Sequence, residues 1–62
     1  MNNMLEAAIF LYEHFSGEKW WVSMYDEDGV IVIRHTINAD ASSVPDEVLG
    51  VPVMLSPYSR ER

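Results

Sequence analysis

The chain contains no cysteine, and this absence excludes two devices that hold many small proteins together. Disulfides and thiolate-bound zinc both require cysteine. A chain of 62 residues buries only about 60% of the surface that its unfolded form exposes. Two histidines, His14 and His35, do not make a metal site without clustered partners. We therefore expect no cofactor or metal, and we expect association with another chain to supply part of the stability.

Long hydrophobic runs are also missing. The apolar stretch near the N-terminus is interrupted by Glu6 and Glu13, and no basic segment precedes it. A membrane span needs roughly 18 or more apolar residues, and a signal peptide begins with basic residues. The sequence thus predicts neither a signal peptide nor a membrane span. Together with the lack of cysteine, this favours a cytoplasmic protein.

Basic residues are few. Ten acidic residues oppose four basic ones, for a formal net charge of -6, and Arg60 and Arg62 lie in the last three positions. Nucleic acids and anionic membranes draw proteins through Lys and Arg, so direct binding to either is not expected. A basic protein surface would be attracted instead. The alternative is that the charge only keeps a small protein soluble.

What the chain does have is strong periodicity. Residues 3–16 are apolar at the spacing of one helix face, and Gly17 follows as a stop. The expected face comprises Met4, Leu5, Ala8, Leu11, Tyr12 and Phe15. Phe10 falls on the other side, so we expect it to be exposed or covered by a different molecule.

From Glu18 the period changes to two, which predicts a hairpin over residues 19–37. Asp28-Gly29 favours a type I′ turn, and a four-residue loop over residues 26–29 is the alternative. Alternation predicts one face of Trp20, Val22, Met24, Ile31, Ile33, His35 and Ile37. It predicts a second face of Trp21, Ser23, Tyr25, Val30, Val32, Arg34 and Thr36. The first face is the more apolar and should receive the helix.

The remaining residues predict shorter elements. Pro45 to Gly50 suits a single helical turn, and Val51 to Leu55 suits an outer strand because Pro52 confines it to an edge. The expected fold is α+β, an N-terminal amphipathic helix on a small sheet in the order αβββ. The third strand could lie beside the first or the second. We expect one domain over residues 1–56 and a flexible tail over residues 57–62.

No motif specifies a reaction. The segment DEDG at residues 26–29 contains a fragment of a calcium loop, but Met24 and His35 would occupy loop positions one and twelve, where neither supplies the needed oxygen. His14 and His35 could act as bases, yet neither is accompanied by a nucleophile signature. We therefore expect a protein that is not an enzyme.

The second sheet face is the candidate site. Aromatic side chains and Arg dominate binding hot spots, and this face carries Trp21, Tyr25, Val32 and Arg34. The alternative is ordinary cross-strand packing, covered in part by the C-terminal segment. The expected contact set adds Phe10 and an acidic hairpin tip of Asp26, Glu27 and Asp28 that would steer encounter.

Two functional hypotheses follow. The first is a small acidic protein-binding module, in one version an inhibitor that docks on a basic surface of its target, as phage-type inhibitors and nucleic-acid mimics do. The second is a structural subunit that forms a homodimer through its sheet.

Overall fold

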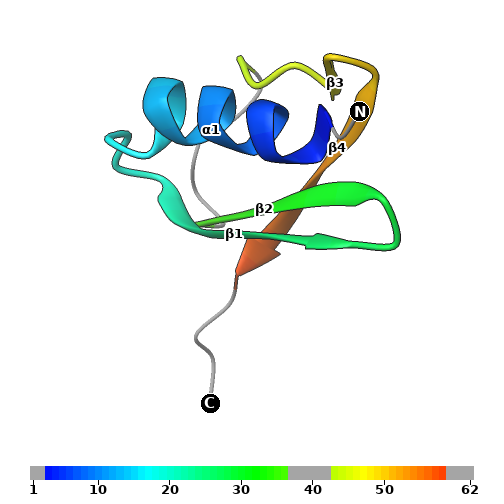
Figure 1. The fold of residues 1–62 in the computed structure, drawn as a ribbon. Helices are drawn as coiled ribbons and strands as arrows, with labels where there is room; N and C mark the ends of the chain where they lie inside the picture. The colour runs from blue at the N-terminus through cyan, green and yellow to red at the C-terminus, as the bar shows by residue number, and fades with distance from the viewer. Residues whose placement is uncertain (1–2, 37–42, 59–62) are drawn as a thin grey trace.

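The computed structural model describes residues 3–36 and 43–58. It contains one helix, α1 (Asn3–Phe15), followed by the strands β1 (Trp21–Glu27), β2 (Val30–Thr36), β3 (Glu47–Val48) and β4 (Val51–Tyr58). The helix lies on one face of the sheet (Figure 1). The α+β fold with an N-terminal helix, a central hairpin and a C-terminal strand is confirmed. Within the described part of the chain, no helix is long and apolar enough to cross a bilayer.

The strands form one sheet in the order β1-β2-β4-β3. The hairpin strands β1 and β2 are antiparallel, whereas β4 lies beside β2 and runs parallel to it. Two parallel neighbouring strands cannot be joined by a tight hairpin turn and require a crossover connection. The third predicted strand is therefore beside the second, which leaves β1 at one side of the sheet.

The core lies between the helix and the sheet. Ala7 and Leu11 of α1 and Ile31 and Ile33 of β2 are almost fully enclosed. The remaining core side chains come from the loop and the C-terminal strands, and from the residue before β1: Trp20, Val44, Val48, Val51 and Val53.

The buried side of the helix differs from the expected one. Leu11, Met4, Ala8 and Phe15 pack into or against the core as expected, but Leu5 and Tyr12 are exposed. The buried side of the helix is centred on Ala7 and Leu11 instead, and Leu5 and Tyr12 fall outside it. A stripe of large apolar side chains is therefore left in solvent.

Both hairpins turn through two residues with positive φ. Asp28 and Gly29 have φ of 53° and 80°, and Leu49 and Gly50 have φ of 53° and 78°. Positive φ at both central residues is what a type I′ turn requires, so the two-residue turn at Asp28-Gly29 holds and the four-residue loop does not.

The short helical turn expected at residues 45–50 is wrong. Glu47 and Val48 form β3 instead, pairing with Pro52 and Val51 of β4. The glycine at position 50 is needed for a hairpin turn rather than for a helix stop. Strand β4 extends to Tyr58, beyond the expected domain boundary at residue 56, and residues 59–62 of the expected tail lie outside the described residues.

The two turns give a matched pair of variants, because Asp28 and Leu49 share a φ of 53°. Asn and Asp adopt this conformation more readily than Leu. We expect Leu49→Asn to raise the free energy of unfolding by about 0.5 kcal/mol and Asp28→Leu to lower it by about 1 kcal/mol. Urea unfolding followed by circular dichroism measures both. A loss of stability in Leu49→Asn would contradict the turn assignment.

Candidate protein-binding surface

A β-bulge near the start of β1 decides which side chains reach each face of the sheet. Trp21 pairs with His35 and Ser23 pairs with Arg34, so Val22 is an extra residue without its own partner on β2. An extra residue reverses the alternation on one side of it. The Trp20 carbonyl still accepts a hydrogen bond from the Thr36 amide at 3.0 Å, so pairing resumes beyond the bulge.

The bulge moves Trp21 to the helix side, so its predicted place on the second face is wrong. Its indole is half-buried against the core and meets the Tyr12 ring edge-on, with ring centroids 5.9 Å apart and planes at 80°. Val22, expected in the core, is exposed instead. The period-two pattern hides this feature because no residue type in the segment marks a bulge.

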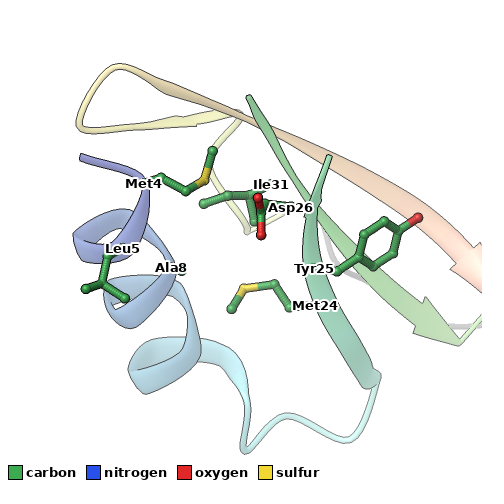
Figure 2. A pocket seen from close by; sticks show the side chains of 7 residues that line it. All are labelled: Met4, Leu5, Ala8, Met24, Tyr25, Asp26 and Ile31. Atoms are coloured by element: carbon green, nitrogen blue, oxygen red, sulfur yellow. The ribbon is translucent and has the colours of Figure 1, made fainter. Parts of the chain in front are cut away.

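The second face does contain a row of large apolar side chains that crosses three strands. Tyr25 of β1 is paired with Val32 of β2, and Val32 with Met54 of β4, so their side chains share one side of the sheet. Tyr25 is 46% exposed and Met54 is 54% exposed, whereas Val32 between them is only 6% exposed. Figure 2 shows the Tyr25 ring pointing away from the helix. We call this side of the sheet the outer face.

Polar side chains border the row. Arg34, half-buried, is paired with Ser23 on one side and Ser56 on the other. A shallow hollow of about 270 Å³ runs over the outer face. It is lined by Tyr25, Glu27, Asp28, Val30, Val32, Met54 and Ser56. No described element covers this face, because the helix lies on the opposite one (Figure 1).

Met54 is the residue of the outer face that sequence reasoning missed. Its membership of the outer face depends on the parallel register of β4 against β2. The sequence left the place of this strand open, so no local signal aligned Met54 with Val32.

The side chains of the acidic tip do not all lie on one side of the sheet. Asp26 is paired with Ile31 on the helix side, and Glu27 is paired with Val30 on the outer side. Asp28 lies in the turn, and all three carboxylates are exposed. The tip therefore presents negative charge to a partner that approaches either face.

Phe10 is exposed, as expected, but it does not join the outer face. Its ring lies 4.1 Å from that of His14, one turn later on the helix. The His14 Nδ1–H donates to the Phe10 carbonyl at 2.9 Å, and the His35 Nδ1–H donates to the Thr36 carbonyl at the same distance. Both histidines thus bind nearby backbone. Phe10 remains a separate candidate contact on the helix, apart from the outer face.

A second hollow lies between α1 and β1. It has a volume of about 240 Å³ and opens beside the N-terminal half of the helix (Figure 2). Its lining residues are Met4, Leu5, Ala8, Met24, Tyr25, Asp26 and Ile31. We call it the α1–β1 groove. Among the described residues that line it, Asp26 has the only ionisable side chain besides the Tyr25 phenol.

Among residues 3–36 and 43–58, no group of three or more His, Cys, Asp or Glu side chains could hold a metal ion.

Comparison with protein-family models, with curated proteins and with solved structures finds no match for this chain.

The bulge makes a direct prediction about stability. We expect Trp21→Ala to lower the free energy of unfolding by about 2 kcal/mol, because it removes an aromatic side chain packed against the core. Tyr25→Ala should cost less than about 1 kcal/mol, since its ring is half in solvent. Urea unfolding of both variants measures the difference. Equal losses would contradict the placement of Trp21 on the helix side.

Proposed function

We propose that this protein is a non-enzymatic, acidic protein-binding module that docks through the outer face of its sheet. The observation that carries the proposal is the row of Tyr25, Val32 and Met54, which spans three strands with no described layer over it. A sheet with apolar groups on both faces is stable when both are covered. Here the helix covers one.

The residue types of the row suit binding. Tyr buries a large area with little loss of conformational freedom, which explains its frequency in hot spots. Met is flexible and polarisable, so it adapts to the shape of a partner. The buried Val32 between them gives a rigid floor. Arg34, at the border of the row, adds a donor suited to carboxylate or backbone oxygens.

Charge selects the kind of partner. Eight of the ten acidic residues lie in the described part of the chain, against only Lys19 and Arg34 among the basic ones. Such an excess steers a basic surface toward the module and repels nucleic acid and anionic membranes. A module of this kind acts by occupying its partner, so we propose inhibition of a basic target site as its effect. We place this activity in the cytoplasm, where a chain without cysteine loses nothing to a reducing environment.

The test compares the wild-type chain with Tyr25→Ser/Met54→Ser. A partner is first captured on the immobilised protein from an extract of its own cells and identified, and its affinity is then measured with purified components. Loss of one hot spot of about 2 kcal/mol corresponds to roughly thirtyfold weaker binding, so we expect at least that loss. Binding should also weaken as salt rises.

Leu49→Asn is the matched control, because Leu49 is also exposed and apolar but lies in the β3–β4 turn, where its carbonyl accepts a hydrogen bond from the Asn3 side chain. It should bind like the wild type. Unchanged affinity in the double variant, with its circular dichroism intact, would refute docking through the outer face.

A further inference from the structure

The helix leaves a stripe of apolar side chains above the side of the sheet that β1 occupies. Leu5, Ile9 and Tyr12 recur at the spacing of one helix face and are 64%, 47% and 57% exposed. Leu5 lines the α1–β1 groove, and Tyr12 touches Trp21 at the start of β1. The stripe therefore lies on the β1 side of the helix, with Leu5 at the groove and Tyr12 near the start of β1.

Strand β1, which lies beside this stripe, is the outermost strand on its side of the sheet. In the described part of the chain β1 pairs only with β2, so one side of its backbone has no strand beside it. An edge strand of seven residues presents a row of backbone donors and acceptors that another extended chain can pair with. Strand addition of this kind is a common mode of peptide recognition.

The groove has the size of an anchor site for side chains. Its volume of about 240 Å³ is below the roughly 300 to 1,000 Å³ of small-molecule pockets. Met4 and Ala8 line it from the helix, and Met24 and Ile31 line it from the sheet. Apolar walls with two flexible thioethers suit a large apolar side chain that enters from a strand lying against β1.

Charge distinguishes between two possible occupants of the groove and the β1 edge, a second copy of this chain and a basic segment of another protein. Asp26 lies at the groove, Asp28 lies at the end of the hairpin, and Glu6 follows Leu5 on the helix. A second copy of this chain would bring the same net charge of -6 to the site. A segment with Lys or Arg would meet opposite charge instead.

We propose that the β1 edge takes an extended, basic segment of the protein partner as a fifth strand, with an apolar side chain seated in the α1–β1 groove. This inference rests on the proposed function, and it names the part of the partner that is recognised. Alternate side chains of the added strand point to opposite faces of the sheet. One set enters the groove below Leu5, and the other lies beside Tyr25 on the outer face.

The probe is a displayed library of random nine-residue peptides, selected on the full-length chain. We expect enriched peptides to carry large apolar residues at alternate positions and Lys or Arg near one end. The amides of alternate residues in an added strand point toward β1 or toward solvent. N-methylation of one alternate set should therefore abolish binding, whereas methylation of the other set should leave it within about threefold.

Ala8→Phe tests the groove, because Ala8 lines it and a larger side chain would fill it. We expect the selected peptide to bind at least tenfold more weakly to this variant, with unchanged circular dichroism. Leu49→Asn is the matched control, because Leu49 is exposed in the β3–β4 turn and does not line the groove, so this variant should bind like the wild type. If Ala8→Phe fails to fold, the methylated peptides still test the edge.

Several results would overturn the inference. In the selection, these results are that no peptide is enriched or that the enriched peptides lack basic residues. In the binding measurements, they are that both methylated sets have equal effects or that a folded Ala8→Phe binds the peptide fully. A stable dimer that hides the β1 edge would also overturn it. The proposed function fails separately, since it requires that Tyr25→Ser/Met54→Ser lose the partner. A partner lost in that variant but retained in Ala8→Phe refutes the strand and keeps the outer face.

Discussion

The strand β2 carries large apolar side chains on both faces, and the rest of the structure depends on covering them. Ile31 and Ile33 point to the helix and are almost fully buried, while Val32 points the other way and is 6% exposed. The position of β2 between β1 and β4 protects its backbone and lets Tyr25 and Met54 shield Val32 from the sides. These neighbouring side chains thus cover part of Val32, as a second layer of structure would.

This arrangement explains why large apolar side chains of the helix and the outer face remain exposed to solvent. One helix of 13 residues covers one face of the sheet, and its buried side is centred on Ala7 and Leu11. The stripe from Leu5 to Tyr12 is left outside the core, as is the row on the outer face. Exposed apolar surface lowers the stability of a chain this short, and a bound partner would recover that stability.

The sequence predicted the features that local pattern encodes and missed those that depend on pairing. The helix and the hairpin with its Asp28-Gly29 turn followed from periodicity and turn chemistry. The sequence did not predict that Trp21 lies on the helix side of the sheet, because the residue types around Val22 do not indicate a bulge. Met54 could not be aligned with Val32 because parallel pairing across a crossover has no local signal. The outer face therefore holds Tyr25, Val32 and Arg34 of the predicted contact set, lacks Trp21 and includes Met54.

The central claim is that the outer face is bare in the free protein, and the methyl group of Met54 reports on it most directly. In a methyl NMR spectrum of dilute protein, a soluble paramagnetic chelate broadens signals according to their access to solvent. The account predicts strong broadening of the Met54 methyl signal and little effect on the Ile33 methyls. A Met54 signal protected as well as those of Ile33 would show that the chain covers this face itself and would contradict the account.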